Sequence, residues 1–291
     1  MGTRLLFYLI LYPLSLLPLR ALYVISHLFY LILGKIIHYR KEVINNNLKN
    51  SFPEKNEKEI EDIRDKFYKH LSEIAAEMIK MLTMSRKQLS KRYVCVNPEI
   101  VDQYYSQRKS VILMSSHYNN WEWMVLGLDL FFKHHGVGVG APNSNKTFEK
   151  LINKARTRYG TEVIFADRIR EEFKRRDLND IRTTYMMLAD QSPSNPEKSF
   201  KTTFLHQPTA VLYGAEHFAL KYNIPVVYYE VIKRSRGYYE LHFRLITDTP
   251  KTTAHGDITK AYLTLLEETI SKQPENWLWS HKRWKHKVEV E

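Results

Sequence analysis

The stretch SSHYNNWEW, residues 115–123, contains the residue types with the clearest potential for chemistry, and it follows the apolar run VILM. His117 and Glu122 are its only ionisable groups. On one helix their spacing turns the two side chains roughly 140° apart, so they can meet only if the histidine precedes the helix. Asn119 or Asn120 is a suitable N-cap, which would place Glu122 in the first turn, where the helix dipole favours a carboxylate. The stretch therefore predicts a strand, a loop with a histidine base, and a helix start with the acid that orients it.

Two other interpretations compete with this one. A single histidine among aromatic residues commonly serves only in packing, so further polar groups must support a site. Ser115 and Ser116 would offer a nucleophile, but the sequence has no Gly-x-Ser-x-Gly elbow. We therefore favour base catalysis by His117 over a covalent serine mechanism.

Further polar side chains follow other predicted strands. Ligands of open α/β sheets gather outside the carboxyl ends of the strands. The run TTYMMLAD ends at Asp190 and is followed by Gln191, while GVGVGAP precedes a helix that carries Arg156 and Arg158. Each of these residues alone reads as a solvated loop residue, but a shared site explains them together.

The composition limits the kinds of partner. Among 291 residues, Lys and Arg outnumber Asp and Glu by 44 to 32, a formal charge of +12. Such a balance favours an anionic partner, such as a membrane surface, a phosphorylated ligand, an acidic protein or a nucleic acid. The single cysteine, Cys95, excludes an internal disulfide framework, and the scattered histidines form no metal-binding pair. No metal site is expected.

Residues 5–33 form a hydrophobic segment long enough to span a bilayer, although Pro13, Pro18 and Arg20 interrupt it. No small-residue cleavage site follows a short apolar core, which disfavours a removed signal peptide. We predict a membrane anchor over residues 1–37, either one imperfect transmembrane helix or a kinked hairpin in one leaflet, because a buried core helix is rarely so long and apolar. The basic residues after it predict that the remainder lies in the cytoplasm.

The rest of the chain reads as a helical lead-in, residues 38–85, and an α/β core, residues 86–291. Asn56 and Glu59 form a capping-box pattern before apolar residues at helical spacing. In the core, short apolar runs alternate with helical patterns, including a helix expected over 209–222, and two late strands joined by SRG form a hairpin signal. This order predicts a mixed central sheet flanked by helices.

The segment PENWLWSHKRWKHK, residues 274–287, interleaves tryptophans with basic residues. This composition suits nucleic-acid stacking and a bilayer interface about equally. The predicted anchor favours the membrane surface.

Four stretches, in this order, resemble the late acyltransferases of lipid A synthesis, the lauroyl and myristoyl transferase type, within the lysophospholipid acyltransferase superfamily. They are YRKEVINNNLKNSFP at 39–53, HYNNWE at 117–122, LADQSP at 188–193 and NWLWSHKRWK at 276–285. HYNNWE fits the H-x4-D/E motif of that superfamily. The resemblance covers nearly the whole chain and implies a glycerolipid acyltransferase-like fold for residues 38–291.

The resemblance implies an O-acyltransferase in which His117 is the general base and Glu122 holds its ring. Arg156, preferred over Arg158, would bind and position substrate together with Asp190 and Gln191. The implied donor is an acyl chain on acyl carrier protein, and the implied acceptor is a hydroxyl of an anionic lipid A precursor. No cofactor is implied, and the enzyme would act at the cytoplasmic face of the inner membrane.

Two alternatives remain at the level of the sequence. A lysophospholipid or an aminolipid could replace the lipid A precursor as acceptor. A membrane-tethered nucleic-acid-binding protein would use the basic surface, but it has no need of His117 and Glu122, so no nucleic acid is expected. One departure from the family pattern is His206, which stands near an expected glycine in FLHQPTA.

Overall fold

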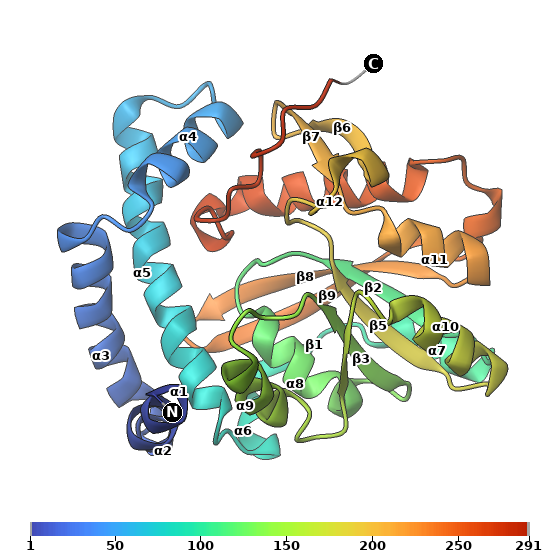
Figure 1. Cartoon of the computed structure of the whole chain (residues 1–291), viewed down its shortest axis with the longest axis horizontal. Helices are drawn as coiled ribbons and strands as arrows, with labels where there is room; N and C mark the ends of the chain where they lie inside the picture. Colours follow the sequence, from blue (N-terminus) through green and yellow to red (C-terminus); the bar gives the residue numbers. More distant parts are fainter. Residues whose placement is uncertain (1, 290–291) are drawn as a thin grey trace.

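The computed structural model describes residues 2–289, which form an α/β domain around a seven-stranded sheet (Figure 1). The strand order is β1-β9-β8-β2-β5-β3-β4. All neighbouring strands are parallel except β8 and β9, which form an antiparallel hairpin. The strands are β1 (Tyr93–Cys95), β2 (Val111–Ser115), β3 (His135–Gly140), β4 (Glu162–Phe165), β5 (Thr183–Leu188), β8 (Val226–Ser235) and β9 (Tyr238–Thr247), with a separate pair β6 (Phe200–Phe204) and β7 (Gln207–Val211).

Helices pack on both faces of the sheet and create two apolar cores. Strand β2 shows why, because its side chains are buried on both faces. Ile112 and Met114 belong to one core cluster, and Val111 and Leu113 belong to the other. The helices are α1 (Gly2–Leu6), α2 (Tyr12–Leu16), α3 (Leu19–Tyr30), α4 (Lys41–Ser51), α5 (Glu57–Met81), α6 (Arg86–Arg92), α7 (Glu99–Ser106), α8 (Trp121–Phe131), α9 (Lys146–Arg156), α10 (Ile169–Leu178), α11 (Gly214–Tyr222) and α12 (Asp257–Lys272).

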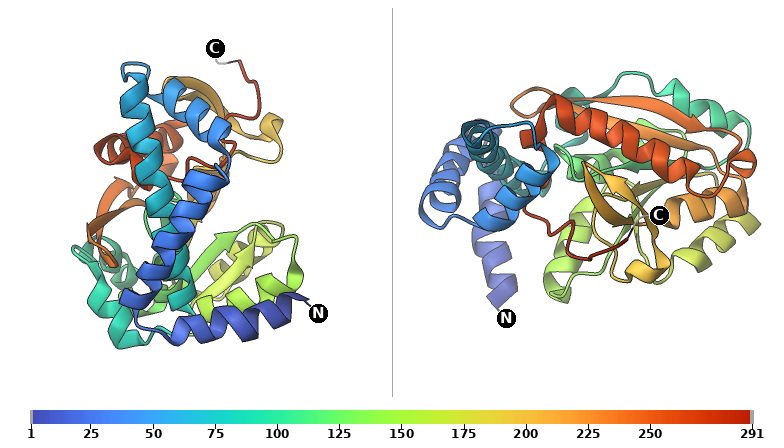
Figure 2. Two further views of the ribbon diagram at one scale, coloured as in Figure 1. Left: turned by 90° about the vertical axis from the view of Figure 1, so that its left-hand side faces the viewer. Right: turned by 90° about the horizontal axis from the view of Figure 1, so that it is seen from above.

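The hydrophobic amino-terminal segment consists of two helical pieces that meet at an angle (Figure 2). The break lies at Leu17 and Pro18, which have extended backbone angles, as expected where proline interrupts a helix. The second piece, Leu19–Ile36, is apolar and long enough to cross a membrane. It also packs along α5, where Leu22 and Tyr23 are buried in the same core cluster as side chains of the sheet. Its outer side exposes apolar side chains.

Local sequence signals explain several element boundaries. Asn56 and Glu59 form the predicted capping box at the start of α5. Asn120 caps α8 by accepting a hydrogen bond from the Trp123 backbone N–H at 3.0 Å. The prediction of a helix over 209–222 was wrong for its first residues. Thr209–Val211 belongs to β7, which pairs with β6, and the helix begins only at Gly214.

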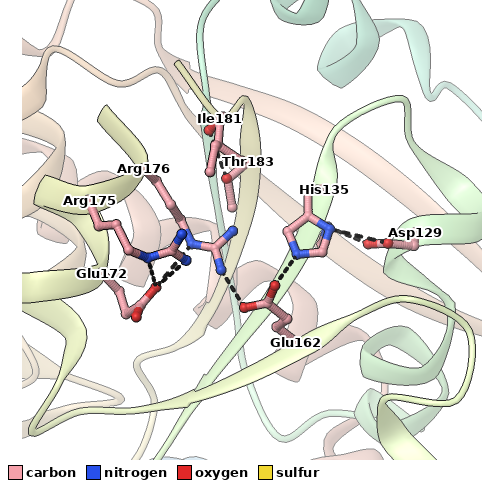
Figure 3. Close-up of polar contacts among 9 residues, drawn as sticks. Asp129, His135, Glu162, Glu172, Arg175, Arg176, Ile181 and Thr183 are labelled. Carbon is pink, nitrogen blue, oxygen red and sulfur yellow. Dashed lines mark hydrogen bonds and ion pairs between the residues drawn. The ribbon is translucent and has the colours of Figure 1, made fainter. Parts of the chain in front are cut away.

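A network of charged side chains lies at the amino ends of β3 and β4, on the opposite side of the sheet from the carboxyl ends of these strands (Figure 3). His135, at the start of β3, contacts Glu162 at 2.8 Å and Asp129 at 3.3 Å. Arg176, buried on α10, binds Glu162 from the other side and also contacts Glu172. These residues lie at the amino ends of the strands, so they support the sheet from the edge away from the candidate site.

Candidate active site

His117 lies in the loop between β2 and α8, and its partner is Asp190, directly beyond β5. Nδ1 of His117 lies 2.8 Å from Oδ1 of Asp190, and the His117 backbone N–H donates to Oδ2 at 2.9 Å. Strands β2 and β5 are parallel neighbours, so the loops after them meet at one sheet edge. With Nδ1 donating its proton to Asp190, Nε2 is the nitrogen that can accept a proton. It lies 3.2 Å from the amide nitrogen of Gln191.

Asp190 is buried and held in its ionised form. Burial by itself raises the pKa of this carboxyl, but His117, through its charge and its hydrogen bonds, and the Trp277 indole lower the pKa below its ordinary value. The Trp277 Nε1–H donates to Oδ2 at 2.9 Å. A buried carboxylate fixed in this way holds the imidazole in one orientation and one tautomer.

Glu122 does not hold the His117 ring, and this part of the sequence prediction needs correction. Its carboxylate forms a bidentate ion pair with Arg156, with Nε to Oε2 at 2.8 Å and Nη2 to Oε1 at 2.6 Å. Glu122 is in the first turn of α8, as predicted, and Arg156 ends α9. The paired fork geometry of guanidinium and carboxylate explains the preference for this partner.

A cavity of about 230 Å³ connects these groups. Its polar side is formed by His117, Glu122, Arg156 and Gln191. The remaining wall is mostly apolar and comes from α8, β3, β4 and β5: Trp121, Val125, Gly138, Val139, Gly140, Ala141, Val163, Met186 and Leu188. The cavity therefore combines one polar end with an apolar slot, which suits a ligand that has a reactive head and a hydrocarbon chain.

The structure separates the two predicted arginines. Arg156 lines the cavity, and pairing with Glu122 outweighs burial and raises its pKa. Arg158 points elsewhere and donates to the backbone carbonyls of Leu82, Met81 and Met84. Arg158 thus ties α9 to the end of α5 and is not part of the cavity wall.

The carboxyl-terminal aromatic and basic segment is mainly interior, contrary to its assignment to a membrane surface. Trp277 and Trp279 are buried, and Arg283, also buried, donates to Thr209 and Ala210. The backbone of Asn276 accepts the N–H of Asn119 at 3.0 Å. The segment therefore supports the His117 loop and Asp190 from behind, a role that composition did not reveal.

A second histidine lies near this pair. His281 accepts a hydrogen bond from the Ser192 backbone N–H through Nε2 at 3.1 Å. Burial lowers its pKa to about 4, with the charges of His117 and Arg283 acting in the same direction against Asp190. It is therefore neutral and serves to hold the loop after β5.

The fold and the site together define an α/β protein with a histidine–carboxylate pair beside a cavity that has polar and apolar walls. The family model described as bacterial lipid A biosynthesis acyltransferase matches residues 2–286, nearly the whole chain, and the protein belongs to this family. It is therefore an acyltransferase of lipid A biosynthesis. No curated protein matches the chain in sequence.

Proposed function

We propose that this protein transfers a fatty acyl chain from an acyl carrier protein thioester to a hydroxyl of a lipid A precursor, with His117 as the general base. The observation that carries the proposal is the Asp190–His117 pair at the polar end of the apolar slot. Such a pair activates a hydroxyl, and such a slot accommodates an acyl chain.

The transfer needs one base and donors for the developing oxyanion. His117 Nε2 removes the proton of the acceptor hydroxyl as its oxygen attacks the thioester carbonyl carbon. The tetrahedral intermediate then expels the thiolate, which takes the proton from the His117 imidazolium. The guanidinium of Arg156 is a donor on the cavity wall suited to the oxyanion or to a substrate phosphate. The amide of Gln191, which lies against His117 Nε2 in the free protein, becomes a second such donor once the acceptor hydroxyl replaces it at Nε2. No acyl-enzyme is formed.

Glu122 has a different role in this mechanism from that of an orienting acid for the base. Its bidentate bond fixes the partly buried guanidinium of Arg156 at the cavity wall. An arginine held in this way needs no reorganisation when charge develops on the substrate. We therefore assign Glu122 and Arg156 to substrate positioning and Asp190 to the support of His117.

The setting of the reaction is the cytoplasmic face of the inner membrane. The apolar helix Leu19–Ile36 supports membrane attachment, and the basic residues that follow it favour the cytoplasmic side. Because this helix packs along α5, we favour attachment within one leaflet over a full span. The net positive charge suits both an acidic carrier protein and an anionic lipid.

Mass spectrometry of reaction products tests the proposal. Purified protein, lauroyl-acyl carrier protein and a lipid A precursor in vesicles should yield an acceptor heavier by one acyl group, with free carrier thiol in equal amount. A lysophospholipid in the same vesicles should stay unmodified. Acylation of the lysophospholipid in place of the lipid A precursor would contradict the proposed acceptor.

A further inference from the structure

A carboxylate outside the cavity, Glu77 of α5, lies completely buried where three other elements meet. Its Oε1 accepts a hydrogen bond from the hydroxyl of Tyr23 on α3 at 2.6 Å. Its Oε2 accepts from Nδ2 of Asn120 at 2.6 Å and from the hydroxyl of Tyr239 on β9 at 2.8 Å. All three donors are neutral, so Glu77 joins the amino-terminal apolar helix, the start of α8 and the sheet through one side chain.

Placing a carboxylate at this position is costly. Burial raises the pKa of Glu77, and the hydrogen bonds from Tyr23, Asn120 and Tyr239 act against that rise. An apolar side chain would fill a core position without this cost. The arrangement therefore indicates a use for the hydrogen bonds themselves.

The first use lies at α8. Asn120 is the N-cap of this helix, and its two amide atoms are both engaged, Oδ1 by the Trp123 N–H at 3.0 Å and Nδ2 by Glu77. Glu122 lies in the same turn and holds Arg156 in the cavity. By fixing the Asn120 amide, Glu77 fixes the turn from which the Glu122 carboxylate projects.

The second use lies at α3, whose outer side is apolar and exposed. The Tyr23 hydroxyl reaches Glu77 only when α3 is seated against α5. We propose that Glu77 is a positioning residue that couples the seating of α3 to the placement of Glu122 in the cavity. Because it assigns Glu122 to substrate positioning, this inference rests on the proposed function. Detaching α3 removes one of the three donors from Glu77 and loosens the cap of α8.

Two tyrosines of α3 provide a matched test. The hydroxyl of Tyr23 donates to Glu77, and the hydroxyl of Tyr30 donates to both oxygens of Asp65, also on α5, at 2.9 Å. Tyr23→Phe and Tyr30→Phe each remove one hydroxyl from the same helix and leave the ring. Only the first has a connection to the cap of α8.

Amide hydrogen exchange over residues 119–126 and steady-state kinetics should be measured on both variants with vesicle-bound acceptor. We expect Tyr23→Phe to speed exchange in this segment and to lower kcat by about tenfold, because small misplacements of positioning groups reduce rates strongly. KM for the acceptor and vesicle binding should stay unchanged, and Tyr30→Phe should behave as wild type. Exchange over 119–126 that is equal in the two variants would overturn the coupling, whatever the true substrates are.

A swap of donor and acceptor gives an independent test. Asn120→Asp keeps a capping oxygen for the Trp123 N–H but faces the Glu77 carboxylate with a second one. Adding Glu77→Gln restores a donor–acceptor pair between the two residues with reversed direction, although the new amide nitrogen also faces the Tyr239 hydroxyl, which can then only accept from it. We expect kcat to fall about tenfold in Asn120→Asp and to recover in part in the double variant, as interacting residues are non-additive. Additive losses in the double variant would refute the proposed coupling. The proposed function is tested separately, by the turnover of the wild-type protein with the lipid A precursor.

Discussion

At the scale of single residues, the two carboxylates near His117 have different partners. Asp190 contacts the imidazole and Glu122 contacts Arg156. Spacing along the chain favoured Glu122 as the partner of the histidine, because the two are close in sequence. The order of strands decides otherwise, since β5 lies directly beside β2 and brings Asp190 to the ring.

Arg156 and Arg158 allow a matched test of the cavity. Arg156→Lys loses the bidentate bond to Glu122, so we expect kcat/KM to fall on the order of 10- to 100-fold, with little change in stability. Arg158→Lys removes donors from three backbone carbonyls of the α5 end and should lower the melting temperature while kcat/KM of the folded protein is kept. Kinetics and thermal unfolding of both variants provide the check. Equal kinetic losses would contradict the assignment of Arg156 alone to the cavity.

At the scale of elements, the hairpin β6–β7 shows what the sequence did not reveal. Its two-residue turn, Leu205 and His206, has φ of 47° and 62°, the left-handed region in which glycine and asparagine are usual. Leucine and histidine gave no turn signal, so the strands on either side were not predicted. The runs VILM, GVGVGAP and TTYMMLAD and the late hairpin were predicted, because apolar runs and the SRG turn are local signals.

The same turn predicts a stabilising substitution. His206 is exposed and holds a positive φ at a steric cost, so His206→Gly should raise the free energy of unfolding by about 0.5–1 kcal/mol. Leu205→Gly is the matched control, because the Leu205 side chain is buried and its loss should destabilise by about 2–3 kcal/mol. Denaturant unfolding measures both. Destabilisation by His206→Gly would show that its side chain makes contacts that the hairpin needs.

Two histidines in different elements predict opposite pH dependences of stability. Burial, with the charge of Lys233, lowers the pKa of His70 well below its ordinary value of 6.5, so its folded form stays neutral while the unfolded form gains a proton below that pH. Stability of the wild type should therefore fall with pH below 6.5, and His70→Leu should remove up to about 1.4 kcal/mol of this fall per pH unit.

The bonds to Asp129 and Glu162 outweigh burial and raise the pKa of His135. Its contribution is complete below pH 6.5 and is lost as pH rises through the folded value.

Unfolding of His70→Leu and His135→Gln at pH 5.5 and pH 8.5 tests these signs. Relative to wild type, His70→Leu should gain stability at pH 5.5, and His135→Gln should lose more stability at pH 5.5 than at pH 8.5. If the stability difference from wild type changes in the same direction between pH 8.5 and pH 5.5 in both variants, the buried neutral His70 or the ion-paired His135 would be contradicted.

At the scale of the whole molecule, the α/β class, the hairpin of β8 and β9 and the placement of His117 and Asp190 beyond the carboxyl ends of strands followed from sequence patterns. Contacts between distant segments did not. Trp277 donates to Asp190 across 87 positions of the chain, and the seating of α3 on Glu77 crosses 54. Periodicity and spacing describe only neighbours in the chain, so these contacts depend on the complete fold.

The exposed apolar side of the amino-terminal helices predicts how the protein meets a membrane. Val24 of α3 is 74% exposed, and Leu178 of α10, away from this surface, is 73% exposed. Val24→Glu should weaken vesicle binding about tenfold or more, since burial of such a side chain in lipid contributes about 1.5–3 kcal/mol. Leu178→Glu should leave vesicle binding unchanged. Co-sedimentation with vesicles measures both, and equal losses would show that the charge change, not the apolar surface, governs attachment.

Carrier-thiol release from acyl carrier protein thioester, in the presence of lipid A precursor, tests most directly whether His117 is the catalytic base. His117→Ala should lower kcat by about 10²–10⁴-fold, the range of base catalysis, in a protein that still folds. Its melting temperature should be lower than that of the wild type, because the buried Asp190 loses its hydrogen bond to the imidazole. Asp190→Asn should cause a loss of similar size, and the double variant should be little worse than His117→Ala, because the two residues act as a unit. Normal thiol release by folded His117→Ala would contradict base catalysis by His117.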